Sequence, residues 1–306
     1  EEYGGAGLSL LGKCIVWEEV GKTGAVPFRA IGDVFGPAAR ILVECTEPQK
    51  EKYLFPLIRG DKRVSFALTE PEAGSDAASI QTRAVKRDSH YVINGAKRFI
   101  TRGHEADFFQ VFAVTDPEKR ARGGITCFLV DADMPGVELG SRFETMMGDS
   151  PSEIFFTDVQ VPEENILGTL GEGFVLAQRW TTEGRLHHGA RGVGTAQRCL
   201  DMSIEFANQR KTFGQPLANR QAILFMIADS AMELHAARLM VYDCAWKHDQ
   251  GKNVRNEVFM VKVFANEMVS RVVDRAIQIH GSIGLTKELP LERWYRDVRS
   301  RRITEG

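Results

Sequence analysis

The sequence predicts an α+β fold: an N-terminal helical module, a small antiparallel β-domain and a C-terminal four-helix bundle. Three observations predict this order. Apolar residues recur at helical spacing in residues 1–62, short β-branched and aromatic runs fill residues 63–168, and helical spacing returns in residues 169–306. We expect three domains with these boundaries, of which the first and the last are incomplete.

In the N-terminal module the apolar residues form two helical stripes. The first stripe comprises Leu11, Ile15, Val16 and Val20, and the second comprises Ile31, Val34 and Phe35. The chain starts at Glu1 like the middle of a loop, and it stops one residue after Glu305. We therefore expect that both ends have been trimmed from a longer protein.

The middle domain is predicted from five runs rich in β-branched and aromatic residues. These runs are Val64 to Leu68, Tyr91 to Ile93, Phe108 to Val114, Ile125 to Val130 and Ser152 to Val161. Turn signals at Asn94-Gly95 and Met134-Pro135-Gly136 separate them, as expected of antiparallel strands.

From Gly173 onward, apolar residues recur every three or four positions over a span too long for one short helix. They include Ile223, Leu224, Met226, Ile227, Met232, Leu234 and Leu239. This pattern predicts long packed helices, as in a four-helix bundle. The order of the three parts excludes the alternating βαβ pattern of a Rossmann protein, and no Gly-x-Gly-x-x-Gly follows a predicted strand.

The composition is that of an ordinary soluble globular protein. A net charge of -2 over 306 residues gives no field strong enough to predict nucleic acid or an anionic membrane as a general partner. No apolar run reaches the ~18 residues of a membrane-spanning helix. The five cysteines contain no C-x-x-C, so they predict neither a disulfide framework nor a zinc site. They favour a reducing compartment, which would be the cytoplasm of a bacterium or the mitochondrial matrix of a eukaryote.

Two distant segments have residue types suited to a phosphate-bearing ligand. In Thr69 to Asp76, glycine lets the backbone approach a ligand closely, while hydroxyls and amides offer hydrogen bonds; the alternative is a simple strand-to-turn device. In Arg210 to Gly214, a forked cationic donor lies near a hydroxyl and, further on, near Gln221, which suits a pyrophosphate and its ribose. A surface salt bridge is the alternative there. His187 and His188 are adjacent rather than four apart, so no metal site is expected.

Together with Gln278 to Gly284, these segments resemble the acyl-CoA dehydrogenase family in order and spacing, and the resemblance covers the whole chain. It implies that the protein binds FAD and acts on an acyl-CoA. The implied cofactor-binding residues are Phe66, Leu68, Thr69, Gly74, Ser75, Phe99, Ile100, Thr101, Arg210, Thr212, Phe213, Gln221, Gln278, Gly281 and Ser282. Ser75 is shared with the acyl-CoA, whose other implied contacts are Thr182 and Arg185. Phe99 replaces the more frequent tryptophan of the family.

The last residues, Ile303 to Gly306, resemble the family's Tyr-Glu-Gly-Thr loop, with Thr304 in place of tyrosine. The resemblance implies that Glu305 is the catalytic base; a solvated terminal carboxylate is the alternative. Some family members carry the base on a helix, at the position that Gly184 occupies here. Glu183 is one residue away and points about 100° around that helix, so it ranks second.

The implied reaction is α,β-dehydrogenation of an acyl-CoA thioester to the trans-2-enoyl-CoA, as in fatty acid β-oxidation. Glu305 removes the α-proton, hydride passes to the flavin, and electrons then pass to electron-transferring flavoprotein. The family also implies a homodimer or homotetramer with FAD sites shared between subunits. The alternatives are an acyl-CoA oxidase that uses oxygen and a non-catalytic DNA-binding relative with a basic C-terminal run. The arginines of that run are Arg293, Arg296, Arg299, Arg301 and Arg302.

Overall fold

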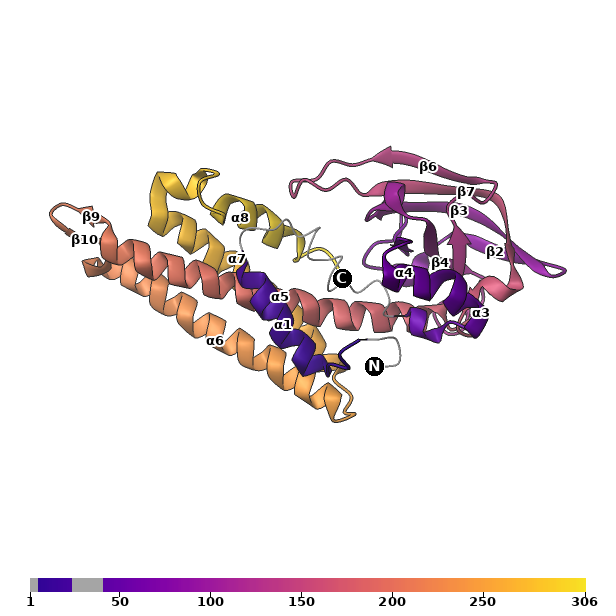
Figure 1. The fold of residues 1–306 in the computed structure, drawn as a ribbon, viewed down its shortest axis with the longest axis horizontal. Helices are drawn as coiled ribbons and strands as arrows, with labels where there is room; N and C mark the ends of the chain where they lie inside the picture. The colour runs from indigo at the N-terminus through magenta and orange to yellow at the C-terminus, as the bar shows by residue number, and fades with distance from the viewer. Residues whose placement is uncertain (1–4, 24–40) are drawn as a thin grey trace. The chain divides into compact units, whose positions relative to one another are not determined.

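The computed structural model describes residues 5–23 and 41–306 (Figure 1). The second predicted stripe, Ile31, Val34 and Phe35, and the first four residues lie outside the described residues. The chain divides into two compact units. The helical unit comprises residues 1–35 and 182–305, and the sheet unit comprises residues 36–181 and Gly306. The three predicted domain boundaries stay predictions.

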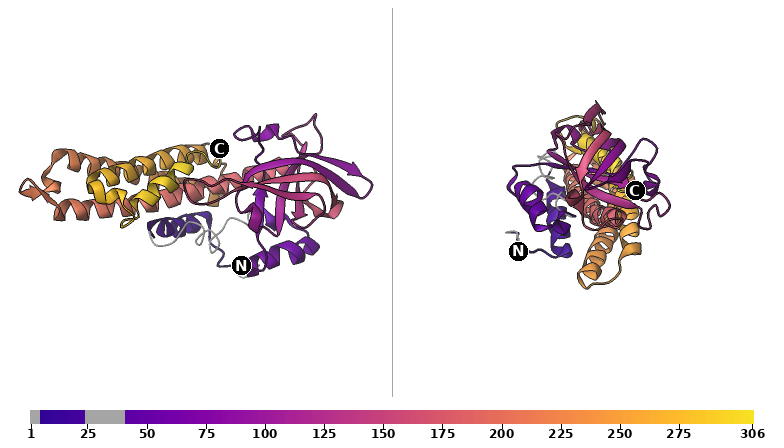
Figure 2. Two further views of the ribbon diagram at one scale, coloured as in Figure 1. Left: turned by 90° about the horizontal axis from the view of Figure 1, so that it is seen from above. Right: turned by 90° about the vertical axis from the view of Figure 1, so that its right-hand side faces the viewer.

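The helical unit is built from a short N-terminal helix and four C-terminal helices. They are α1 (Leu10–Lys22), α5 (Gly173–Gln209), which begins in the sheet unit, α6 (Gln221–Asp249), α7 (Arg255–His280) and α8 (Leu291–Ser300). Figures 1 and 2 show α5 and α6 lying lengthwise side by side. Their inward faces, with those of α7, α8 and α1, form one apolar core that includes Trp17, Leu186, Val241, Val261 and Trp294. The predicted C-terminal bundle is therefore present.

The buried face of α1 differs from the predicted stripe. Cys14 and Trp17 are buried in the core, whereas Ile15 is 45% exposed. Glu18 is also buried, because its carboxylate accepts hydrogen bonds from Arg238 Nε (3.0 Å) and Tyr242 Oη (2.7 Å) of α6. The predicted stripe is wrong at Ile15, since counting apolar residues alone misses a glutamate that is buried by its partners.

Two glycines let α1 approach α5 closely. A Cβ added to Gly194 would lie 1.9 Å from the carbonyl oxygen of Glu18, and one added to Gly21 would lie 2.4 Å from that of Arg191. Asp249, the last residue of α6, accepts hydrogen bonds from the first amides of α1, at 2.8 Å and 2.9 Å. This carboxylate satisfies donors that have no partner within the helix. The short N-terminal helix is thus fixed to the bundle at both of its ends.

The sheet unit holds one sheet of eight strands with the order β6-β7-β3-β2-β4-β5-β8, and β1 beside β4 (Figure 1). The strands are β1 (Val64–Ala67), β2 (Arg83–Arg87), β3 (His90–Ile100), β4 (Phe108–Val114), β5 (Ile125–Asp131), β6 (Val137–Arg142), β7 (Ser152–Pro162) and β8 (Ile166–Leu167). The short helices α3 (Glu47–Gln49) and α4 (Phe55–Arg59) precede them. The α+β fold class is confirmed.

The sheet is mixed rather than purely antiparallel, because β1 pairs with β4 in parallel and β2 meets β4 through one parallel pair. All five predicted runs are strands. β2 and β6 were not predicted, since they are mainly exposed and lack a run of apolar residues. Pairing of β2 with β3 and of β6 with β7, rather than their own periodicity, holds these two strands in the sheet.

The Asn94-Gly95 turn prediction is wrong, whereas Met134-Pro135-Gly136 does form a turn between β5 and β6. Asn94 and Gly95 lie inside β3, where the register against β7 shifts. Gly95 has a φ of 151°, and a Cβ there would meet Thr82 at 2.5 Å. Asn-Gly therefore marks a β-bulge here, which uses the same backbone freedom as a tight turn.

No helix among the described residues is both long and apolar enough to span a membrane.

Candidate functional site

In the sheet unit, the loop after β1 and the end of β3 lie together. The Arg98 amide donates to the Thr69 carbonyl at 2.8 Å, and the Ser65 hydroxyl donates to the Thr101 carbonyl at 2.8 Å. Parts of the chain that are 29 or more residues apart in sequence thereby form one edge. The structure thus brings the predicted residues of the Phe66 to Ser75 segment next to those of the Phe99 to Thr101 segment.

A buried ion pair joins the same two segments. Lys97 is fully buried, and its Nζ donates to Glu70 Oε1 at 2.7 Å and to the Leu68 carbonyl at 3.0 Å. Burial lowers the pKa of Lys97 to about 8, although the Glu70 carboxylate opposes this. Burial alone would raise the pKa of Glu70, but the charge and hydrogen bond of Lys97 outweigh it, and that pKa is lowered. Neither residue of this pair is among the predicted site residues, because the only signal in the sequence is a charged residue in each of two motif segments.

The predicted residues of this edge divide into supporting and accessible groups. Leu68 and Ile100 are buried and pack in the interior behind the edge. Phe66 stacks on Trp180 with ring centroids 4.7 Å apart. Phe99 is 53% exposed, with its ring beside Phe143. Gly74, Ser75 and Thr101 are exposed, and Thr69 is half-buried.

An exposed aromatic ring beside exposed hydroxyls and a glycine suits a flavin, which has both an apolar ring face and polar edges. The donor set of this edge therefore fits the cofactor that the sequence implies.

In the helical unit, the structure brings Glu305 next to Gly184 and Arg185. Arg185 Nε donates to the main-chain carbonyl of Glu305 at 2.8 Å. Glu305 has a φ of 63°, and its carboxylate fills the space above Gly184. A Cβ at residue 184 would lie 2.6 to 2.8 Å from three atoms of this carboxylate. Thr182 is half-buried on the preceding turn of α5.

Glu183, the second-ranked base, lies in a different environment. Its carboxylate forms a salt bridge of 3.2 Å with Lys13 of α1. Residues 183 and 184 point to different sides of α5, so an ion pair forms on one side and the Glu305 contact on the other. This arrangement favours Glu305 over Glu183 as the reactive carboxylate.

Positive charge surrounds the Glu305 segment. Burial lowers the pKa of Arg185, an effect that the Glu305 charge opposes. Lys262 of α7 donates to the Arg302 carbonyl at 3.2 Å, and burial followed by the charge of Arg185 lowers its pKa. His188 Nε2 lies 4.0 Å from Glu305 Oε1. Sequence reasoning missed Lys262 and His188 at this place, because no motif links either of them to the last loop.

The remaining predicted residues lie where α5 and α7 end. Arg210 and Phe213 belong to the turn formed by β9 (Lys211–Thr212) and β10 (Gln215–Pro216). Phe206 and His280 stack at 4.5 Å and so tie this region to the end of α7. The exposed predicted residues there are Arg210, Phe213, which is 96% exposed, Gln221, Gln278, Gly281 and Ser282.

Within one chain these residues are far from Glu305. Arg185 and Gln209 lie at opposite ends of a continuous stretch of α5. At 1.5 Å per residue, the helix separates them by about 36 Å. One chain therefore does not bring Arg210 and Phe213 to its own Glu305.

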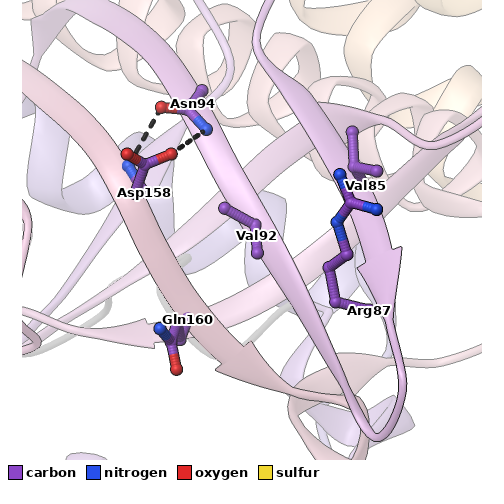
Figure 3. A pocket seen from close by; sticks show the side chains of 6 residues that line it. All are labelled: Val85, Arg87, Val92, Asn94, Asp158 and Gln160. Carbon is purple, nitrogen blue, oxygen red and sulfur yellow. Dashed lines mark hydrogen bonds between the residues drawn. The ribbon is translucent and has the colours of Figure 1, made fainter.

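A shallow hollow of about 370 Å³ lies over the neighbouring strands β7, β3 and β2 of the sheet (Figure 3). Asn94 and Asp158 exchange two hydrogen bonds at its edge, of 2.9 Å and 3.0 Å. The residues lining it are Val85, Arg87, Val92, Asn94, Asp158 and Gln160. It contains none of the predicted site residues.

In the part of the chain that the structure describes, no three His, Cys, Asp or Glu side chains are placed to hold a metal ion. The five cysteines are buried free thiols.

Comparisons with known proteins cover the whole chain. Three family models match: the N-terminal domain of acyl-CoA dehydrogenase over residues 1–61, its middle domain over residues 65–159 and its C-terminal domain over residues 171–306. A 3-(aryl)acrylate reductase of Clostridium sporogenes is 40% identical, over 100% of this chain and 82% of the relative. The caffeyl-CoA reductase-Etf complex subunit CarC of Acetobacterium woodii is 44% identical, over 87% of this chain and 70% of the relative.

Solved structures match over the same extent. Butyryl-CoA dehydrogenase from Megasphaera elsdenii has a TM-score of 0.87 and 37% identity, and the match covers 100% of this chain and 81% of that chain. The FAD complex of PigA has a TM-score of 0.92 and 29% identity, with the same coverage.

Proposed function

This chain belongs to the acyl-CoA dehydrogenase family, and we propose that it oxidises the Cα–Cβ bond of an acyl-CoA thioester with Glu305 as the base. It is an oxidoreductase, and its cofactor is FAD. The observation that carries the proposal is the Glu305 carboxylate, which lies in the space left by Gly184 while Arg185 holds its main chain.

The chain's own residues act on the substrate proton. Glu305 takes the α-proton of the thioester as a general base, and Arg185 keeps the loop that carries it in place through the 2.8 Å hydrogen bond. Bound FAD supplies the acceptor for the hydride that leaves the β-carbon. Thr69, Ser75 and Thr101 would hold FAD through their accessible hydroxyls, with Phe99 against its ring system. Ser75 and Thr182 would contact the acyl-CoA.

The test follows the absorbance of oxidised flavin after anaerobic mixing of the FAD-loaded protein with a panel of acyl-CoAs. We expect bleaching by the wild type and at least a ~100-fold slower rate in Glu305→Gln, since general-base catalysis contributes about 10²–10⁴-fold. Glu183→Gln is the matched control and should bleach at close to the wild-type rate. Bleaching by Glu305→Gln at the wild-type rate would remove Glu305 from this role.

The reverse reaction is a second candidate function. The caffeyl-CoA reductase subunit, 44% identical, is named for reduction, and the same proton-transfer group serves both directions by microscopic reversibility. Protein whose flavin has been reduced beforehand should then be reoxidised by an enoyl-CoA under anaerobic conditions. Two rates are compared: oxidation of the reduced protein by an enoyl-CoA and reduction of the oxidised protein by an acyl-CoA, with the same potential difference driving each. If the first is slower, dehydrogenation remains the main function.

We propose electron-transferring flavoprotein as the electron acceptor, because one relative is named as a subunit of an Etf complex. Substrate-reduced protein should be reoxidised faster by this flavoprotein than by dissolved oxygen. The opposite order of rates would support the oxidase alternative.

The DNA-binding alternative receives little support from the basic C-terminal run. Arg296 pairs with Glu292 at 2.9 Å, and Arg302 pairs with Glu267 at 2.6 Å. Arg301 is buried and pairs with Asp297. These pairs neutralise charge that a phosphate backbone would need.

We also propose an oligomer in which Arg210 and Phe213 of one chain serve the flavin of another. The proposal rests on the separation of about 36 Å along α5 and on the 96% exposure of Phe213. Phe213 has the Arg220 guanidinium 5.7 Å from its ring centroid, yet the ring stays exposed on the hairpin, as is typical of an aromatic side chain at a protein–protein interface.

A further inference from the structure

His188 lies one helical turn after Gly184, on the same side of α5 as the Glu305 carboxylate. Residues four apart on a helix lie one above the other. Its Nε2 is 4.0 Å from Glu305 Oε1, and the two side chains are only 14% and 17% exposed. A charge on the imidazole would therefore act on the carboxylate with limited screening by water.

A second carboxylate faces His188 from α8. Burial alone would raise the pKa of Asp297, but the charges of Arg301, Arg191 and His188 outweigh it, and the pKa is lowered. Arg191 of α5 is itself buried, and burial with the charge of Arg301 lowers its pKa to about 9. Several titratable and charged groups lie around the pair formed by His188 and Glu305. They are His187, Arg185 and Arg191 on α5, Lys262 on α7, and Asp297 and Arg301 on α8.

The neighbouring histidine has a different environment. The His187 ring meets the Trp17 ring of α1 edge-on, with centroids 4.8 Å apart. Arg185 binds the main-chain carbonyl of Glu305 and so fixes the loop, whereas His188 faces the carboxylate itself. The adjacent pair thus divides into a packing histidine and a histidine directed at the proposed base.

On the basis of the proposed role of Glu305, we propose that His188 is a positioning residue whose protonated ring keeps the Glu305 carboxylate ionised and seated above Gly184 in mildly acidic conditions. An opposite charge within about 4–6 Å favours the ionised form of a carboxylate. Without that charge, Glu305 takes up a proton from solvent at a higher pH and can no longer accept one from substrate.

The test is the pH profile of anaerobic flavin reduction by one good acyl-CoA. In His188→Gln, which keeps a polar side chain without the charge, the acid limb should move to higher pH by about one unit, the lower end of the range for a nearby charge. The rate should fall about tenfold on the acid limb and stay within about twofold of wild type at alkaline pH. An acid limb that does not move would overturn the proposal.

Two further variants make the result specific to charge at this position. His188→Lys keeps a positive charge at all working pH values and should restore the wild-type acid limb; an upward shift as in His188→Gln would count against the proposal. His248→Asn removes a histidine whose side chain is 51% exposed in the same unit, and its profile should match that of wild type. An equal shift in His248→Asn would show that the effect is not local.

A readout without turnover separates this inference from the proposed function. Calorimetric binding of an unreactive acyl-CoA thioether, in two buffers of different ionisation enthalpy, reports the protons taken up. Below neutral pH, the number of protons taken up by His188→Gln should differ from that taken up by wild type. When Glu305→Gln is added to both proteins, this difference should disappear. If Glu305→Gln reduces flavin normally, the base assignment fails. If Glu305→Gln is inactive and His188→Gln changes neither profile nor proton uptake, only the inference about His188 fails.

Discussion

At the scale of single residues, Gly184 and Glu305 are complementary. A carboxylate fills the space that any side chain at residue 184 would need, since an added Cβ would lie 2.6 Å from its carbon. The absence of a side chain at one position is therefore a condition for the acid at the other. Sequence comparison links the two positions only as alternative locations of a base, whereas the structure shows that both cannot be occupied at once.

Replacing Gly184 with alanine should displace the Glu305 carboxylate by close to 1 Å, because ordinary contacts begin near 3.4 Å. A misplacement of this size costs about 100-fold in rate. The rate constant of flavin reduction should fall accordingly, while thermal stability stays equal or rises, since alanine favours a helix by up to about 1 kcal/mol. Gly192→Ala on the same helix, where the new Cβ would meet Val269 at 3.4 Å, should keep the wild-type rate. A Gly184→Ala rate within twofold of wild type would show that the carboxylate adjusts freely.

The Lys97–Glu70 pair is the second residue-scale feature with a measurable consequence. Lys97→Met leaves the buried Glu70 carboxylate without its cation, which should cost about 3–5 kcal/mol of unfolding free energy. Adding Glu70→Gln should recover part of that loss, because the uncompensated charge disappears. Urea denaturation of the FAD-loaded proteins, with FAD affinity measured in parallel, checks both expectations. Equal stability of Lys97→Met and wild type would mean that Glu70 is solvated in solution.

At the scale of elements, α1 is bound to the bundle by close backbone contacts and polar contacts as well as by its buried apolar residues Leu10, Cys14 and Trp17. Gly21 and Gly194 bring the two backbones together, and Thr195 Oγ1 donates to the Gly21 carbonyl at 3.1 Å. Glu18 then reaches Arg238 and Tyr242. Apolar periodicity predicts the helix but not its whole buried face, since Glu18 and Gly21 are among the buried residues of α1.

Gly194→Ala should push α1 away from α5, because the new Cβ would lie 1.9 Å from the Glu18 carbonyl. We expect a loss of about 1–3 kcal/mol, typical of overpacking in a well-packed interior. Thermal denaturation measures it. Gly12→Ala, inside α1 with only ordinary contacts at 3.5 Å, should be neutral or stabilising. Similar melting temperatures for Gly194→Ala and wild type would contradict this packing.

At the scale of the whole molecule, α6 carries an exposed apolar stripe that repeats every seven residues. The stripe consists of Phe225, Met232, Leu239 and Trp246, which are 47–64% exposed. Residues seven apart lie on nearly the same face of a helix. A long apolar stripe exposed to solvent is typical of a protein–protein interface, which agrees with the proposed oligomer.

The double substitution Met232→Glu and Leu239→Glu should therefore reduce the molecular mass seen by light scattering, because two acids in the stripe would be desolvated on association. If Arg210 and Phe213 serve a neighbouring chain, FAD content should fall in the same variant. His248→Glu, also exposed on α6 but off the stripe, is the control. A full-size assembly that retains FAD would exclude this stripe as the interface.

The sequence alone determined the parts of this protein that local patterns encode. The five apolar runs became strands, the long helical spacing became α5 to α7, and the motif residues of the sheet unit lie along one edge. The cofactor and family followed from the same motifs. These features depend on neighbouring residues or on short motifs, whose physical requirements can be read locally.

Only the tertiary structure decided the rest. The bulge at Asn94-Gly95 and the buried Glu18 depend on partners far away in the chain. The exposed strands β2 and β6 depend on pairing with β3 and β7. The approach of His188 to Glu305 joins residues more than a hundred positions apart. Ion pairs, close backbone contacts and the charge around a carboxylate are set by distance in space, which periodicity along the chain does not report.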